Sequence, residues 1–181
     1  MSLDASPWVR RFAPLIRSGG TVLDVACGSG RHVRLLAEMG LDVTAVDRDA
    51  AAVEPLRGIA EVVVADIENG PWPFAGRRFN AVVVTNYLWR ALLPTLRESL
   101  EDGGLLLYET FADGQQHIGR PCRPAFLLER GELLRAFAGL HVLAFEDGLL
   151  ADPPRRVQRL AALQATATML PATGWPLGAE G

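Results

Sequence analysis

The chain has 181 residues, of which 49% are hydrophobic, so it is long enough to bury a sizeable core in one domain. Its net charge of −3 argues against a general binder of nucleic acid or membrane surfaces, and because all 18 basic residues are arginine, lysine chemistry is excluded. Two cysteines are too few for a disulfide scaffold, and the opening residues lack the apolar core of a signal peptide, so a cytoplasmic protein is predicted.

Apolar runs alternate with amphipathic segments after a lead-in helix, which is predicted at residues 7–16 and is closed by Gly19 and Gly20. Strands are predicted at residues 21–26, 42–46, 61–65, 80–85, 105–108, 140–146 and 155–167. Helices are predicted at residues 31–38, 49–56, 89–100 and 131–137, with Pro94 interrupting the third of these. Residues 1–170 are expected to form a single domain that begins with the lead-in segment 1–20, and residues 171–181 a flexible tail.

The first five predicted strands are continuous apolar runs and do not alternate with polar residues. Strands of that kind are buried on both faces, as they are in parallel sheets covered by helices. The sequence therefore predicts an α/β fold with an open, doubly wound sheet and helices on both of its faces. Because ligands bind such sheets at the carboxyl ends of the strands, the residues that directly follow the strands are the candidate site.

A loop with few side chains follows the first strand in the run TVLDVACGSGR. Gly28 and Gly30 can adopt a positive φ, and the lack of a side chain lets a ligand approach the backbone. The helix that starts near Arg31 would present free N–H groups and the positive end of its dipole to this loop. The loop therefore suits a ligand that carries a carboxylate or a phosphate.

Acidic residues also end the second and third strands. Asp47 can accept hydrogen bonds from both hydroxyls of a ribose. Asp66 can accept one from an exocyclic amine, and Ile67 can pack against a flat base. Together with the glycine loop, these residues indicate a cofactor that contains adenosine.

Two cofactor classes fit this arrangement. A dinucleotide site has the pattern G-x-G-x-x-G, but Val33 stands here in place of the third glycine. Asp24, upstream of the loop, can hold water or loop amides that face the amino-acid end of S-adenosylmethionine. The residues favour S-adenosylmethionine and leave a nucleotide-dependent oxidoreductase as an alternative.

The motifs VLDVACGSG, AVDRD, VVADI and NAVVVTNYL resemble those of the class I S-adenosylmethionine-dependent methyltransferases over about residues 20–111. Within that family the chain looks most like a small bacterial branch that includes tellurite-resistance-type methyltransferases. The resemblance implies a seven-stranded, mostly parallel sheet whose last strand is antiparallel, a strand that residues 155–167 can supply.

The resemblance also implies a binding role for each residue of these motifs. The methionine end of the cofactor would lie against four residues of the first motif, namely Asp24, Ala26, Gly28 and Gly30. Asp47 would hold the ribose with Arg48 beside it, and Asp66 and Ile67 would hold the adenine. Asn86 would offer its backbone carbonyl to the amino group of the cofactor.

Methyl transfer is an in-line displacement that depends more on alignment than on acid–base groups. A thiolate or oxyanion acceptor needs no base, whereas a hydroxyl or ring nitrogen needs one, for which Tyr87, Glu109 and His117 are the candidates. The alternatives are aromatic packing for Tyr87, a loop cap for Glu109 and an exposed loop position for His117. No metal site is predicted.

The remaining features concern the acceptor. Cys122 lacks a surrounding nucleophile motif, and TNYL stands where amino-directed nucleic-acid methyltransferases have Asn-Pro-Pro-Tyr. Because the core elements fill the chain, a small-molecule acceptor is predicted, with neither a nucleic-acid nor a membrane partner, and the oligomeric state stays open. A non-catalytic S-adenosylmethionine-binding module is the alternative, since no acceptor motif is evident. Cys27 is expected to be a buried filler and His32 to lie on the surface.

Overall fold

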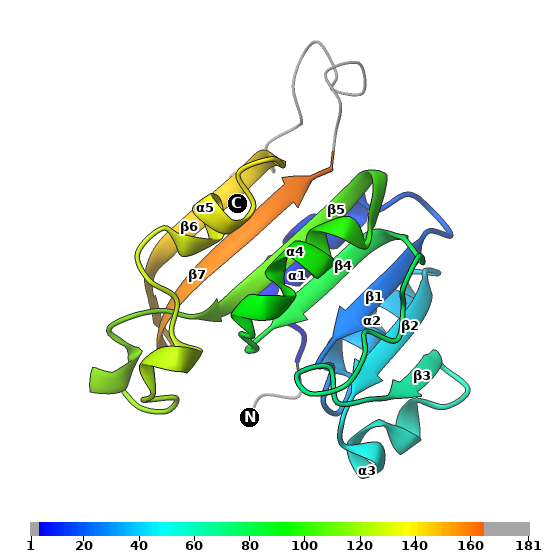
Figure 1. Ribbon diagram of the computed structural model, residues 1–181, viewed down its shortest axis with the longest axis horizontal. Coiled ribbons are helices and arrows are strands. Elements are labelled where there is room, and N and C mark those ends of the chain that lie inside the picture. The colour runs from blue at the N-terminus through cyan, green and yellow to red at the C-terminus, as the bar shows by residue number, and fades with distance from the viewer. Residues whose placement is uncertain (1–3, 165–181) are drawn as a thin grey trace.

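A seven-stranded sheet forms the centre of the computed structural model, which describes residues 4–164, so the predicted tail at 171–181 lies outside the described residues. The strand order is β3-β2-β1-β4-β5-β7-β6 (Figure 1). The strands are β1 (Thr21–Val25), β2 (Asp42–Asp47), β3 (Glu61–Val64), β4 (Phe79–Thr85), β5 (Leu100–Phe111), β6 (His141–Ala151) and β7 (Pro154–Leu163). Neighbouring strands are parallel from β3 to β5, whereas β7 is antiparallel to both β5 and β6. The predicted doubly wound, mostly parallel sheet with an antiparallel last strand is confirmed.

Helices cover both faces of the sheet. The α-helices are α1 (Pro7–Phe12), α2 (Arg31–Glu38), α3 (Ala50–Val53), α4 (Leu93–Glu98) and α5 (Glu132–Ala136). The 3-10 helices are η1 (Ala13–Leu15), η2 (Glu54–Leu56), η3 (Arg90–Leu92), η4 (Gln115–His117) and η5 (Pro124–Phe126). Helices α1, α2 and α3 share one buried cluster, and α4 and α5 share the other. Among residues 4–164, no helix is both long and apolar enough to cross a membrane.

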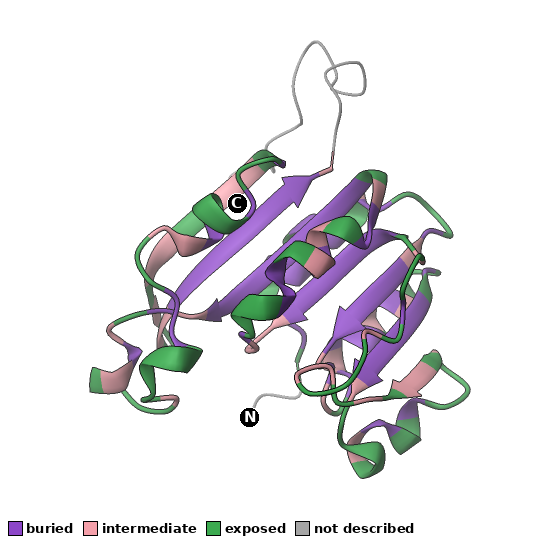
Figure 2. Cartoon of the chain, viewed as in Figure 1, coloured by how far each residue is buried: buried purple, intermediate pink, exposed green. Residues whose placement is uncertain are grey.

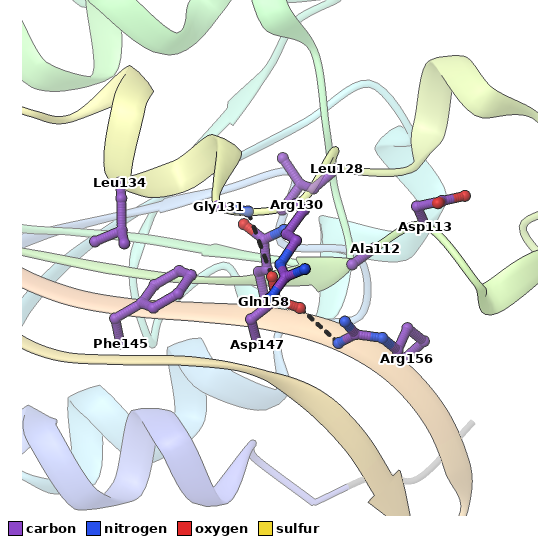
Figure 3. A pocket seen from close by; sticks show the side chains of 10 residues that line it. All are labelled: Ala112, Asp113, Leu128, Arg130, Gly131, Leu134, Phe145, Asp147, Arg156 and Gln158. Carbon is purple, nitrogen blue, oxygen red and sulfur yellow. Dashed lines mark hydrogen bonds and ion pairs between the residues drawn. The ribbon is translucent and has the colours of Figure 1, made fainter.

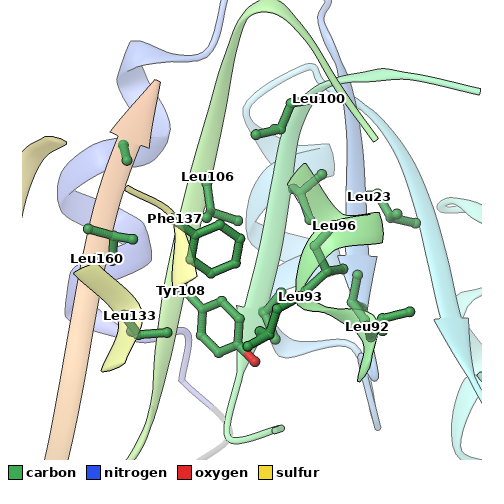
Figure 4. Packing of buried hydrophobic residues seen from close by; sticks show 14 of the residues in the cluster. Leu23, Leu92, Leu93, Leu96, Leu100, Leu106, Tyr108, Leu133, Phe137 and Leu160 are labelled. Carbon is green, nitrogen blue, oxygen red and sulfur yellow. The ribbon is translucent and has the colours of Figure 1, made fainter. Parts of the chain in front are cut away.

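The central strands are buried on both faces, as their continuous apolar sequences predict (Figure 2). On β4, Val82 and Val84 face the α4 side, while Ala81 and Val83 face the α1 side. Figure 4 shows the α4 side, where leucines of α4 pack with Tyr108 of β5 and with Phe137. Packing on both faces holds the sheet in place, and because β1 to β5 are parallel, their carboxyl ends lie along one edge of it.

Strand β5 differs most from its prediction. It begins at Leu100 and not at residue 105, and the helix predicted to reach residue 100 ends at Glu98. Leu100 pairs with Phe79 across a register shift, and Gly103, at φ 77°, lies in the irregular stretch that follows. Pro94 does not interrupt a helix but lies in the first turn of α4, where its missing N–H has no cost. The final strand ends at Leu163, and its predicted residues 165–167 lie outside the described residues.

Candidate functional site

The candidate site lies where β1 and β4 are neighbours, because the strand order reverses there and a crevice opens at the carboxyl ends of the strands. A cleft of about 200 Å³ occupies this edge. Its lining comes from the segments that end β1, β2 and β3 and follow β4, and it comprises Ala26, Asp47, Arg48, Ala65, Asp66, Ile67, Glu68 and Tyr87. The structure thus brings together predicted binding residues from three motifs.

The glycine loop between β1 and α2 has left-handed backbone at Gly28 (φ 55°) and Gly30 (φ 75°). The two glycines serve different purposes. A Cβ at Gly30 would overlap the side chain of Leu56, so this position is closed by packing. A Cβ at Gly28 would meet no atom within 4 Å among residues 4–164, so the space beside the Gly28 backbone is open there. Gly28 is therefore the position at which a ligand can reach the main chain.

The Asp47 carboxylate ties the second strand to this loop. Its Oδ2 accepts a hydrogen bond from the Gly28 N–H at 2.8 Å, and its Oδ1 accepts one from the Asp49 N–H at 2.9 Å. Each carboxylate oxygen keeps a further lone pair. Asp47 can therefore hold the loop and still accept hydrogen bonds from two adjacent hydroxyls.

Asp66 forms a turn at the end of β3. Its Oδ1 accepts from the N–H groups of Glu68 and Asn69 at 3.0 and 3.2 Å, and its Oδ2 accepts from Asn69 Nδ2 at 3.0 Å. These hydrogen bonds, that from the Asn69 side chain first, lower the pKa of Asp66. The carboxylate stays ionised and places half-buried Ile67 on the wall of the cleft.

Asp24 is a buried acid of the site whose carboxyl is only partly hydrogen-bonded within the described residues. It is buried beneath the loop, and burial raises the pKa of its carboxyl to about 7, against the opposing effect of nearby Arg31. Within residues 4–164 its Oδ2 has no hydrogen-bond partner. A buried polar atom without a partner costs free energy, so Asp24 Oδ2 can accept from a ligand a hydrogen bond that the described residues do not supply.

The segment after β4 is held in an unusual conformation. Asn86 has φ 55°, its N–H donates to the Glu109 carbonyl at 2.9 Å, and Tyr108 Oη donates to the Tyr87 carbonyl at 3.0 Å. Tyr108 is thus a core residue that positions Tyr87. The Asn86 Oδ1 and Tyr87 Oη atoms are buried without hydrogen-bond partners among the described residues.

Glu109, a candidate base, is buried beneath the N-terminal segment. Its Oε2 accepts from Ser6 Oγ at 3.0 Å and lies 2.8 Å from Arg159 Nε, while Oε1 has no hydrogen-bond partner within residues 4–164. No sequence signal pointed to Ser6 or Arg159, because the contacts join residues far apart in the chain. The ion pair gives Glu109 a structural task whether or not it also takes part in catalysis.

His32 corrects the sequence-based expectation, because it is buried and not exposed on the surface. Its Nε2 accepts from the Ser6 N–H at 3.1 Å, so Nδ1 carries the proton and faces Thr85 Oγ1 at 3.3 Å. Burial lowers the pKa of His32 to about 3, so the ring is neutral. The neutral ring and Glu109 together fasten the N-terminal segment beside the ends of β1 and β4.

The other candidates are spread more widely. His117 is exposed on η4, Cys122 is exposed, and Cys27 is buried as a small filler.

A cavity of about 510 Å³ lies between α5 and the β6–β7 pair (Figure 3), and Asp147 pairs there with Arg156 at 2.6 Å. It shares no lining residue with the cleft. A second cavity, of about 270 Å³, does share two, Glu68 and Tyr87.

The chain matches one protein family and is similar in fold to several solved structures. Residues 1–166 match the family model described as "Methyltransferase domain". The fold is similar to TehB from Haemophilus influenzae, with a TM-score of 0.67 and 20% identity over 88% of this chain and 61% of that chain, so this chain spans about three fifths of that protein. It is also similar to a TehB-like SAM-dependent methyltransferase from Corynebacterium glutamicum (TM-score 0.66, 18% identity, 88% of both chains).

A third similar structure is an S-adenosylmethionine-dependent methyltransferase from Mesorhizobium loti, with a TM-score of 0.69 and 16% identity over 90% of this chain and 100% of that one. No protein with curated annotation matches the sequence. At these identities the structural likeness shows the fold, while the match to the family model covers nearly the whole chain.

Proposed function

From the premise that this chain belongs to the methyltransferase-domain family, we propose that it transfers the methyl group of S-adenosylmethionine to a small-molecule acceptor. The observation that carries this proposal is the cleft lined by Asp47 and by the turn at Asp66, with the Asp47 carboxylate accepting a hydrogen bond from the Gly28 N–H of the glycine loop. The binding roles assigned to the individual residues are part of the proposal.

The residues present fit this cofactor. The open space at Gly28 and the unpartnered Asp24 Oδ2 suit its amino-acid end, and the free lone pairs of Asp47 suit its ribose. Ile67 and the Asp66 turn suit its base. The Asn86 carbonyl, Arg48 and Ala26 keep the roles that the resemblance implies, whereas Gly30 packs against Leu56 and shapes the loop.

When bound, S-adenosylmethionine supplies a methyl group activated by positive sulfur. What the chain contributes is position, because alignment of the reacting atoms accounts for several kcal/mol of the barrier. Tyr87 lies on the wall shared by the cleft and the second cavity, so it can orient an acceptor toward the cofactor. A thiolate or oxyanion acceptor needs no base, and for other acceptors Tyr87 lies at the cleft, whereas Glu109 is buried in its ion pair and His117 is exposed on η4, so Tyr87 keeps a positioning role and the base is left open.

The small-molecule acceptor is supported by the size of the second cavity, about 270 Å³, and by the negative net charge of the chain. A cytoplasmic location, a bacterial origin and the absence of nucleic-acid substrates are proposed on the sequence alone. The alternative of a nucleotide-dependent oxidoreductase is disfavoured by the family match and by Val33, which is buried in the core where that site has a glycine.

Two measurements test the proposal. Titration calorimetry should show saturable binding of S-adenosylmethionine and of S-adenosylhomocysteine, and absence of binding up to millimolar concentrations would refute it. Release of S-adenosylhomocysteine in the presence of candidate acceptors and cell extract should then separate an enzyme from a non-catalytic binding module.

A further inference from the structure

The second cavity, of about 270 Å³, lies beside the cleft proposed for the cofactor. Its lining comes from the segments that follow β3, β4 and β5, and it comprises Glu68, Asn86, Tyr87, Leu88, Thr110, Phe111, Pro121 and Phe126. Because Glu68 and Tyr87 line both spaces, a molecule in this cavity lies next to whatever fills the cleft. The cavity is therefore the place for an acceptor.

Most of the wall is apolar. Leu88 and Pro121 contribute aliphatic surface, and the rings of Phe111 and Phe126 contribute aromatic surface. Phe126 is 42% exposed, so its ring still has surface to bury against a ligand. Such a wall favours a compact molecule with an apolar body.

The polar groups make the electrostatic potential of the cavity negative. Among the described residues that line it, Glu68 alone is charged, and no ion pair to Glu68 is formed within residues 4–164. Tyr87 Oη is buried, and burial followed by the nearby Glu68 charge raises the pKa of the phenol. Arg48, whose charge acts on Tyr87 in the opposite direction, lines the cleft and not this cavity. The carboxylate and the aromatic faces attract a cation, the phenol oxygen can accept a hydrogen bond from an ammonium N–H, and the carboxylate repels an anion.

On the basis of the proposed function, we propose that the acceptor is a small amine whose nitrogen lies at Glu68 and Tyr87 and whose apolar body lies against Phe111 and Phe126. Before reaction, an acceptor that arrives as an ammonium ion passes one proton to the Glu68 carboxylate and on to water. Methylation then forms the bond between nitrogen and the methyl carbon and breaks the bond from that carbon to sulfur. The electron pair stays on sulfur, and the product is the N-methylated ammonium ion of the acceptor, which Glu68 stabilises.

Binding of three probes with the same apolar body tests this proposal without any cofactor present. The probes are 2-phenylethylamine, 2-phenylethanol and 3-phenylpropionate, measured by calorimetry or by ligand-observed NMR. We expect the amine to bind at least about tenfold more tightly than the other two, as one charge-assisted contact implies. Equal binding of the three probes, preferred binding of the carboxylate, or binding of none would overturn the proposal.

Two variants locate the effect. Glu68→Gln should remove the preference for the amine, whereas Glu38→Gln, a matched change of an exposed acid on α2, should leave it unchanged. Phe126→Ala should weaken the amine and the alcohol alike, because it removes only apolar wall. Retention of the preference in Glu68→Gln contradicts the inference, provided that the variant keeps its thermal unfolding transition.

Cofactor titrations separate the two proposals. Normal binding of S-adenosylhomocysteine with no preference for the amine would refute the acceptor inference alone. Absence of cofactor binding to the unmodified protein would instead refute the proposed function.

Discussion

The two halves of the carboxyl-end edge use polar residues in opposite ways. On the β1–β2 side, Asp24 Oδ2 has no partner within the described residues and Asp47 keeps free lone pairs. On the β5–β7 side, Glu109 Oε2 is matched by Arg159 and Ser6, groups of the same chain, while Glu109 Oε1 has no hydrogen-bond partner within the described residues. A buried carboxylate that has a cation of the fold as its partner stabilises the fold, whereas one without such a partner is available to a ligand. The same kind of carboxylate therefore indicates binding on one side and stability on the other.

Removal of the cation on the β5–β7 side should have the largest effect. Arg159→Ala leaves the fully buried Glu109 charge without its partner, so the free energy of unfolding should fall by about 3–5 kcal/mol in urea titrations. Arg11→Ala is the control, because Arg11 lies 3.9 Å from Glu146 on the surface and its loss should cost under about 1 kcal/mol. Similar losses of unfolding free energy in the two variants would show that the buried pair of Arg159 and Glu109 stabilises the fold no more than a surface pair does.

Removal of the acid on the β1–β2 side should have the opposite sign. The Asp24 pKa of about 7 exceeds its ordinary value of 3.8, so between these pH values the native state holds a proton that the unfolded chain has lost. The unfolding free energy of the unmodified protein therefore falls as pH rises through this window. Asp24→Asn should stabilise the protein at pH 8 by about 2–4 kcal/mol, with little gain at pH 4, and should weaken cofactor binding.

Urea titrations of both proteins across this pH range check the prediction. Destabilisation of Asp24→Asn at pH 8 would show that the Asp24 charge is satisfied in the native state, contrary to its unpartnered oxygen.

Asp47 should matter for binding more than for stability. Asp47→Asn removes the charge that would accept the ribose hydroxyls, so the affinity for S-adenosylhomocysteine should fall by roughly 10- to 100-fold in calorimetry. Asp42→Asn, at the exposed start of the same strand, is the control and should bind normally. Unchanged affinity in Asp47→Asn would refute the assigned role.

The smallest effect is expected at the N-terminal segment. Ser6→Ala removes the hydroxyl that donates to Glu109 and caps α1 through the Trp8 N–H at 3.1 Å. The free energy of unfolding should fall by about 1–2 kcal/mol. Hydrogen exchange should show faster exchange in α1 than in α2, and equal protection of both helices would contradict a fastening role for Ser6.

The sequence by itself determined the features that depend on nearby residues. Strand β4 could be predicted from the sequence because a continuous apolar run indicates a strand buried on both faces, whichever strands pair with it. Asp49, the first residue of the helix predicted at 49–56, accepts from the Ala51 and Ala52 N–H groups only two and three residues away. The glycine loop could be predicted because a positive φ favours glycine, as at Gly28 and Gly30, although Ala26 and Asn86 also adopt one.

The tertiary structure alone decided which polar residues meet. Ser6 and Glu109 are 103 residues apart, and His32 is buried because the N-terminal segment returns to cover it. The start of β5 at Leu100 likewise depends on pairing with β4. The cavity shared by Glu68 and Tyr87 forms only when the ends of different strands are aligned. Local preferences set the elements, whereas contacts between distant residues set the partners, because only the folded sheet brings those residues within reach.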